Sequence, residues 1–192
     1  MSFHHKNIRL EHWNYLGQRW FFITLCCANR RKLFSTSQIC DWFLDILRSN
    51  AATHEFAIHA YCLMPDHVHL LAEGLQPRSD LIQFMRAIKL KTSTPFERKT
   101  GKALWQKKFY DHILRNNDSP DAVAWYIWMN PVRANLSQRP EEYPFSGSLT
   151  GKWLQTSQPP VEWLPPWRKP KAPPKVRGRY TSANSPSHSV LS

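Results

Sequence analysis

Two histidines, His67 and His69, are separated by one residue in the apolar run H-V-H-L-L at positions 67–71. Residues i and i+2 of a strand point to the same face of a sheet. Both imidazoles are therefore expected on one face, with Val68 and Leu70 on the other. Such a pair can bind a divalent metal ion, which then needs a third ligand, usually an oxygen, and open positions for a substrate. Taken alone, the pattern favours ordinary hydrogen-bonded histidines over a metal site.

A second candidate pair, Tyr126 and Asn130, lies four residues apart in Y-I-W-M-N. This spacing places both side chains on one face of a helix, about 6 Å apart. The Asn130 carboxamide oxygen could be the third metal ligand, and the Tyr126 hydroxyl could lie next to a metal-bound phosphate. The spacing alone favours a simpler interpretation, in which Tyr126 packs in the core and Asn130 caps the helix ahead of Pro131.

Two further residues are alternatives or accessories to these pairs. Tyr110, in F-Y-D-H with His112 two positions on, is a rival nucleophile to Tyr126. Asp66 precedes the two histidines and could orient one of the imidazoles. A plain turn residue is the simpler interpretation of Asp66.

Hydrophobic periodicity predicts the elements that must position these residues. The expected strands span 19–27, 56–64, 67–73 and 109–114. The segment Pro65-Asp66 predicts a tight turn, so the second and third strands should form a hairpin that places the histidines just after the turn.

Helices are expected between and after the strands, at 36–50, 79–94 and 120–129. The second has a basic face and is expected to be broken by Thr94-Pro95 and Gly101. The third has Ser119 as N-cap and Pro120 in its first turn, and Asn130-Pro131 is expected to terminate it. Residues 132–150 show no regular pattern and are expected to wrap around the domain irregularly.

The element order β-α-β-β-α-β followed by a helix predicts an α+β fold. It corresponds to the ferredoxin-like split βαβ arrangement with a central antiparallel sheet, here with an extra C-terminal helix that carries Tyr126. One domain is expected over residues 1–150. Residues 151–192 are rich in proline and basic residues and are expected to form a largely disordered tail. In this tail, Trp163 and Trp167 could dock on the domain or stack on bases, and the tail could add DNA affinity or cover the active site.

The 192-residue chain has a net charge of +12, which favours a polyanionic partner, nucleic acid first and an anionic membrane surface second. No apolar run reaches the roughly 18 residues of a membrane span, and the N-terminus lacks the apolar core of a signal peptide. We therefore expect a cytoplasmic protein with no membrane partner. Its four cysteines are expected to be reduced and buried; they are Cys26, Cys27, Cys40 and Cys62.

Basic and aromatic residues supply candidate DNA contacts. The candidates for phosphate contacts are Arg30, Arg31, Lys32, Arg86, Lys89, Lys91, Lys107, Lys108 and Arg115. Together they predict a salt-dependent DNA affinity, although any one of them is more often a solvated charge. Three tryptophans could stack on unpaired bases, while core packing is the default for each; they are Trp20, Trp105 and Trp125.

Three motifs in order carry a family resemblance: M-P-D-H-V-H-L-L at 64–71, L-W-Q-K-K-F-Y-D-H-I-L-R at 104–115 and W-Y-I-W-M-N-P-V-R-A-N-L at 125–136. With W-F-F-I-T-L at 20–25 and N-R-R-K-L-F at 29–34, they resemble the REP-associated tyrosine transposases, single-tyrosine members of the HUH (His-hydrophobic-His) superfamily. The resemblance covers roughly residues 13–148, and nothing carries over to the tail.

The resemblance implies a function and a role for each candidate residue. His67 and His69 would bind Mg²⁺ or Mn²⁺, Asn130 would assist, and Tyr126 would attack single-stranded, hairpin-containing DNA to form a covalent 5′-phosphotyrosine. It also implies that Tyr110 lies on a structural, substrate-facing strand, that the protein is associated with the nucleoid, and that it acts as a monomer or homodimer. Two alternatives stay open: a domesticated hairpin-binding protein without cleavage activity, and a metal-dependent phosphodiesterase that uses water.

Overall fold

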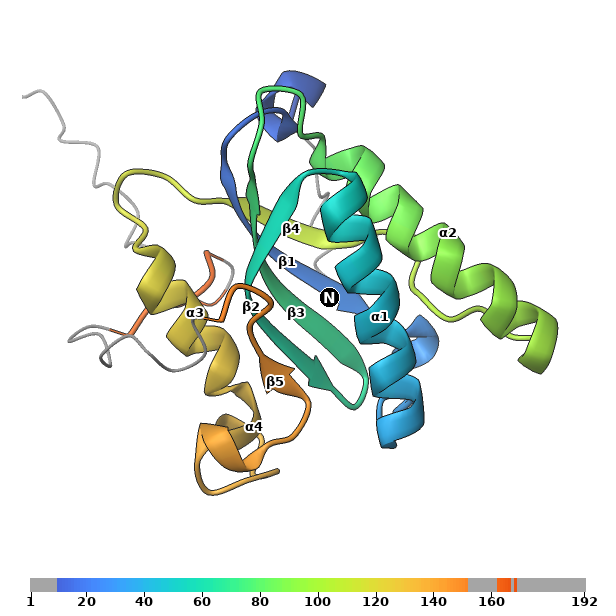
Figure 1. Cartoon of the computed structure of the whole chain (residues 1–192). Helices are drawn as coiled ribbons and strands as arrows, with labels where there is room; N and C mark the ends of the chain where they lie inside the picture. Colours follow the sequence, from blue (N-terminus) through green and yellow to red (C-terminus); the bar gives the residue numbers. More distant parts are fainter. Residues whose placement is uncertain (1–9, 152–161, 167, 169–192) are drawn as a thin grey trace, which may run out of the picture.

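A five-stranded antiparallel sheet forms the centre of the molecule, with α1 and α2 on one face and α3 on the other (Figure 1). The structure is a computed structural model that describes residues 10–151, 162–166 and 168. The strands are β1 (Trp20–Cys26), β2 (Phe56–Met64), β3 (His67–Gly74), β4 (Tyr110–Ile113) and β5 (Ser146–Gly147). Their spatial order is β4-β1-β3-β2-β5. The first four strands therefore have the predicted ferredoxin-like arrangement, and β5 adds a short edge.

The helices follow the predicted order. They are α1 (Ser37–Thr53), α2 (Leu81–Thr100), α3 (Pro120–Trp128) and α4 (Asn130–Arg133), with 3-10 turns η1 (His12–Tyr15), η2 (Ala28–Arg30) and η3 (Pro140–Glu142). Ser119 caps α3 as expected, since its hydroxyl accepts a hydrogen bond from the Ala122 N–H at 3.3 Å. In the described part of the chain, no helix has both the length and the apolar character needed to cross a bilayer.

The predicted break of the second helix at Thr94-Pro95 is wrong. α2 continues through Pro95 and ends at Thr100, before Gly101 in the left-handed conformation expected of a helix end (φ 66°). A proline inside a helix costs about 3 kcal/mol because one hydrogen bond is lost and the ring crowds the preceding turn. Tertiary packing offsets this cost here, since Phe96 packs on the core and the Arg31 guanidinium lies 5.8 Å from its ring centroid.

The region after α3 is more regular than predicted. α3 ends at Trp128, close to the predicted end, and the chain then makes a further helical turn, α4, that was not predicted. β5 then pairs with β2, with Gly147 opposite Tyr61. A Cβ atom at position 147 would lie 2.6 Å from the Tyr61 hydroxyl oxygen, so any residue larger than glycine would force the Tyr61 side chain to shift. The indole N–H of Trp128 donates to the Gly147 carbonyl at 3.1 Å and ties α3 to this edge.

The sheet separates two hydrophobic cores. Successive residues of a strand point to opposite faces of the sheet, so they pack into different cores. Phe21, Ile23 and Leu25 of β1 join the core under α1 and α2. Phe22 of β1 and Leu71 of β3 join the second core, under α3. This double coverage explains why β1 is apolar at every position except Thr24 instead of alternating. It also means that the face under α3 is the one on which His67 and His69 lie.

Candidate active site

His67 and His69 lie at the start of β3 on the face covered by α3, as the strand alternation predicts. In the sheet, Thr24 of β1 and Cys62 of β2 flank His69. Val68 and Leu70 are fully buried in the opposite core. The predicted separation of polar and apolar side chains across β3 is therefore present.

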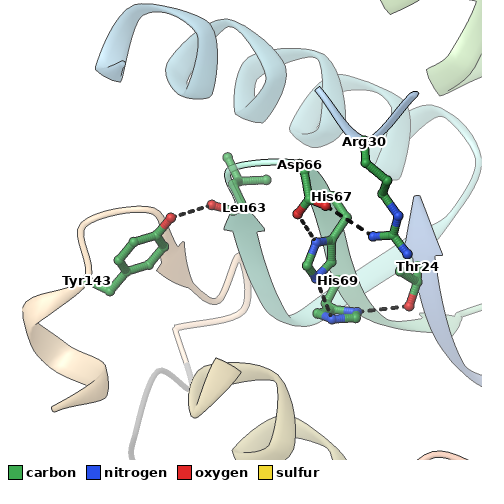
Figure 2. A network of polar contacts seen from close by, with 7 residues as sticks. All are labelled: Thr24, Arg30, Leu63, Asp66, His67, His69 and Tyr143. Carbon is green, nitrogen blue, oxygen red and sulfur yellow. Dashed lines mark hydrogen bonds and ion pairs between the residues drawn. The ribbon is translucent and has the colours of Figure 1, made fainter. Parts of the chain in front are cut away.

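The two imidazoles point their Nε2 atoms toward each other, 3.1 Å apart, with the rings nearly perpendicular at 82° (Figure 2). The other nitrogen of each ring has its own partner. The Nδ1 atom of His67 lies 2.6 Å from Asp66 Oδ1, and the Nδ1 atom of His69 lies 2.9 Å from Thr24 Oγ1. Arg30 in turn donates to Asp66 Oδ2 at 3.3 Å. Asp66 is thus both a turn residue and a side chain that orients an imidazole.

Burial keeps both imidazoles in the neutral form. It lowers the pKa of His69 well below its usual value, and the neighbouring His67 acts in the same direction. It also lowers the pKa of His67, against the opposing effect of the Asp66 carboxylate. A neutral imidazole offers a nitrogen lone pair, and a fixed Nδ1 partner aims that lone pair at the metal. Two converging Nε2 atoms with fixed Nδ1 partners fit a divalent metal ion.

A third metal ligand would have to be a residue other than His, Cys, Asp or Glu. Over residues 10–151, 162–166 and 168, no group of three or more His, Cys, Asp or Glu side chains gathers in a metal-binding arrangement. Asn130 is the predicted oxygen donor. Its side-chain nitrogen donates to the carbonyls of Tyr126 at 2.9 Å and Ile127 at 3.2 Å, which caps α3. Pro131 has no N–H to donate to the Ile127 carbonyl, so the Asn130 side chain supplies the hydrogen bond that this carbonyl would otherwise lack. Capping uses the nitrogen and leaves the carboxamide oxygen for a metal, a role that stays a prediction.

Loss of either Nδ1 partner is expected to weaken metal binding about 10- to 100-fold, since such partners orient the ligand rings. Asp66→Asn removes the carboxylate charge, and Thr24→Val removes the hydroxyl. Titration calorimetry with Mn²⁺ measures the affinity directly, without a DNA substrate. Asp41→Asn, on the exposed surface of α1, is the matched control. An unchanged affinity in both site variants would contradict a metal bound by these imidazoles.

Tyr126 lies on the same face as the histidines, so the structure brings Tyr126 close to His69. Its ring centroid is 6.2 Å from that of His69 and 5.7 Å from that of Phe22. The Arg133 guanidinium lies 4.3 Å from the centre of the tyrosine ring. Burial raises the pKa of the Tyr126 hydroxyl, and the positive charges of Arg168 and Arg133 act in the opposite direction.

Trp163 covers Tyr126, which is only 3% exposed. The two ring centroids are 5.2 Å apart, and the indole N–H of Trp163 donates to Asp118 Oδ1 at 2.9 Å. Glu162 accepts a hydrogen bond from Arg133 at 2.9 Å. The sequence suggested that Trp163 could dock on the domain, and it does; Trp167 lies outside the described residues, as does most of the predicted tail. Residues 162–166 form a segment, here called the C-terminal strap, that closes the site.

The rival nucleophile, Tyr110, lies at the start of β4, opposite Thr24. It is 41% exposed, in contrast to Tyr126. His112, two residues on, makes a 2.9 Å contact with Asp118 through Nε2. The two tyrosines therefore occupy different surroundings on one face of the sheet.

The candidate phosphate contacts divide into two groups. Arg30, Arg31 and Lys89 are engaged within the protein: Arg30 with Asp66, Arg31 with the carbonyl of Ala103, and Lys89 with the carbonyls of Gln106 and Lys107, both at 2.8 Å. The remaining candidates are exposed, and their DNA contacts stay predictions; they are Lys32, Arg86, Lys91, Lys107, Lys108 and Arg115.

The tryptophans are mostly packed, and the cysteines behave as predicted. Trp105 is buried, and its indole N–H donates to Thr92 at 2.7 Å. Trp20 is half-buried and packs against His59 in a tilted arrangement, with ring centroids 4.3 Å apart, and Trp125 is half-buried against Trp128. All four cysteines are buried and free.

One family model and several known proteins match this chain. The family model described as "Transposase IS200 like" matches residues 18–130, a stretch that contains both histidines, Tyr126 and Asn130. A REP-associated tyrosine transposase of Escherichia coli (strain K12) is 29% identical over 131 residues, which cover 68% of this chain and 76% of that protein. A solved structure of a REP-associated tyrosine transposase bound to a REP hairpin is similar with a TM-score of 0.60 at 26% identity. That match covers 76% of this chain and 82% of the other.

Proposed function

Since the chain belongs to the IS200-like transposase family, we propose that it nicks and rejoins single-stranded DNA through a covalent bond to Tyr126. One observation supports this most directly: Tyr126 and His69 come from distant segments of the chain, yet their ring centroids lie 6.2 Å apart on one face of the sheet. The substrate we propose is DNA with a hairpin of the REP type. The similar solved structure is described as bound to such a hairpin, and the net charge of +12 favours a polyanion.

His67, His69 and Asn130 would hold the divalent ion, Mg²⁺ or Mn²⁺, through two imidazole nitrogens and the carboxamide oxygen. When bound, such an ion polarises a phosphate and stabilises the charge that develops on its oxygens. The chain's own residues prepare this site: Asp66 and Thr24 fix the rings, and the sheet holds both imidazoles on a rigid element. The amide oxygen is a ligand type that these ions prefer, whereas imidazole nitrogens are more usual ligands of zinc, iron and nickel.

Tyr126 acts as the nucleophile in this proposal. Its hydroxyl loses a proton, its oxygen forms a bond to the phosphorus, the bond from phosphorus to the 3′-oxygen breaks, and that oxygen takes up a proton. The product is a 5′-phosphotyrosine and a free 3′-hydroxyl. Attack by a 3′-hydroxyl on the phosphotyrosine reverses the step and joins DNA without ATP. Arg133, above the ring, favours the phenolate form that attack requires.

A single assay separates this proposal from its alternatives. The full chain is incubated with a labelled single strand that forms a hairpin, together with Mn²⁺ or Mg²⁺, and the products are resolved on a denaturing gel. A labelled band at the mass of a protein–DNA adduct supports tyrosine chemistry. Hairpin binding without cleavage would support a domesticated binding protein, and cleavage without an adduct would support hydrolysis by water.

The C-terminal strap is expected to slow cleavage, because Trp163 covers the nucleophile. Trp163→Ala should raise the initial rate of adduct formation about two- to tenfold, since an aromatic contact stabilises the closed form by about 0.5–1.5 kcal/mol. Trp163→Phe is the matched control: it keeps a ring over Tyr126 but loses the hydrogen bond to Asp118, so an intermediate rate is expected. A rate in Trp163→Ala equal to or below that of the wild type would show that the strap does not restrain the reaction.

A further inference from the structure

The β4 edge of the sheet lies two strands away from His67 and His69, which are on β3. Among the residues that the structure describes, β4 pairs with β1 alone, so one long side of β4 is the boundary of the sheet there. Register places Tyr110 of β4 opposite Thr24, and Thr24 opposite His69. Cross-strand neighbours point to one face, so Tyr110, Thr24 and His69 form a row across the catalytic face. Two strand spacings separate Tyr110 from His69, which is about 10 Å.

Tyr110 presents an aromatic ring to solvent in this row. It is 41% exposed, whereas the aromatic residues next to it on this face, Phe22 and Tyr126, are almost fully buried. The proposed reaction uses Tyr126, so the function does not account for an exposed ring at the other end of the row. An exposed aromatic face beside a site that processes single strands is a platform on which an unpaired base can stack.

The two ends of β4 carry groups that suit a nucleic-acid backbone. Lys107 and Lys108 are exposed just before the strand. Lys89 of α2 donates to the carbonyls of Gln106 and Lys107, which fixes the loop that presents them. Beyond the strand, a groove of about 690 Å³ is lined by Arg19 and by the exposed segment Arg115–Asn117, among other residues. Asp111 also lines this groove, so its lining is mixed in charge with two arginines against one acid.

These observations lead to one inference, which rests on the proposed function. We propose that the β4 edge is the track for the unpaired DNA that adjoins the hairpin, and that Tyr110 stacks on one of its bases. The distance from Tyr110 to His69 corresponds to about three base steps at the 3.4 Å rise of a stacked strand. A base held there fixes the register of the strand relative to the imidazole pair, so Tyr110 helps to choose which phosphate lies next to Tyr126.

The test compares two fluorescent probes at fixed salt: a blunt DNA hairpin, and the same hairpin with an oligothymidine tail at its 5′ or 3′ end. Fluorescence anisotropy measures the affinity of the full chain for each probe. Tyr110→Ala is expected to weaken binding of a tailed hairpin by about 5- to 150-fold, the factor that stacking on one aromatic ring provides. Its affinity for the blunt hairpin should stay the same. Tyr110→Phe, which keeps the ring, should restore the preference for the tail.

The salt dependence of DNA binding is a second, independent part of the same test. For the tailed probe, we consider the slope of log affinity against log salt concentration. In the double variant Lys107→Ala/Lys108→Ala, the magnitude of this slope should fall by about 1.4, which is 0.7 for each lost single-strand phosphate contact. Leu90→Ala, an exposed apolar position on α2 (63% exposed), is the control for both arms. Its affinity and salt dependence should match the wild type.

The outcomes also separate this inference from the proposed function. If Tyr110→Ala loses the same affinity for both probes, or loses none for either, the proposal that unpaired DNA binds along the β4 edge is wrong. A Tyr110→Phe variant that behaves like Tyr110→Ala would also overturn it, because the ring would then not be the contact. A protein that forms no adduct with DNA yet prefers the tailed hairpin through Tyr110 would support the track and overturn the cleavage mechanism.

Discussion

Tyr126→Phe is expected to abolish the covalent protein–DNA adduct and to lower strand cleavage by at least about a thousandfold, as removal of a nucleophile does in enzymes with covalent intermediates. The substitution removes one oxygen and keeps the ring contacts with Trp163, Phe22 and His69. Hairpin affinity and thermal stability should therefore change little. Denaturing gels report the adduct, anisotropy reports binding, and circular dichroism reports folding.

The other tyrosines make this experiment decisive. Tyr61→Phe is the matched control, since Tyr61 is a half-buried tyrosine of β2 whose side chain packs on the opposite core. It should retain the adduct. Tyr110→Phe tests the rival nucleophile: an adduct that disappears in Tyr110→Phe and persists in Tyr126→Phe would assign the nucleophile to Tyr110. Cleavage that survives both substitutions would leave water as the attacking group.

His67→Ala and His69→Ala are each expected to reduce metal-dependent cleavage by at least about a hundredfold, while hairpin binding changes far less. The reason is that a bound ion supplies several kcal/mol of charge stabilisation in the transition state, and each 1.4 kcal/mol is a factor of ten in rate. The loss should coincide with loss of Mn²⁺ binding in calorimetry. His69→Ala should also lower stability, because His69 is buried and stacks on Phe22 at 5.3 Å.

A surface histidine gives the comparison that this experiment needs. His12→Ala removes an imidazole whose side chain is 60% exposed and which contacts Asp80, far along the sequence from the candidate ligands. Its cleavage and Mn²⁺ affinity should match the wild type. If His67→Ala loses binding and cleavage to the same extent, the substitution has damaged the fold. If cleavage persists without Mn²⁺ binding, the imidazoles have another role.

Sequence reasoning succeeded where the pattern is local. The i, i+2 spacing placed His67 and His69 on one face, and the element order predicted the four-strand topology that brings α3 over that face. Tyr126 also lies on a helix over that face, whereas α3 ends at Trp128 and Asn130 begins α4. The spacing of Tyr126 and Asn130 could not show that Asn130 uses its nitrogen to cap α3, because that depends on the missing N–H of Pro131 and on the orientation of one amide.

The parts that sequence reasoning missed depend on contacts between distant segments. α2 passes through Pro95 because Phe96 packs on the core, and nothing in the local pattern reports that packing. β5 has two residues, too few to show alternation, and the only local signal is a glycine, Gly147, where Tyr61 leaves no room for a side chain. The closeness of Thr24 to His69 needs the register of β1 against β3, which periodicity does not give.

Because the sheet separates the two cores, we expect the two sides of the protein to undergo local unfolding at different free energies. The core under α3 depends on a nine-residue helix and on the strap, whereas α1 and α2 supply 17 and 20 residues to the other core. Amide hydrogens of α3 should therefore exchange with solvent before those of α1, as in proteins whose smaller cooperative units open first. Opening of this kind would move the tyrosine away while β1, β2 and β3 keep the imidazoles in register. In the proposed reaction, one DNA end would then leave the site and another would enter without unfolding of the strands that hold the imidazoles.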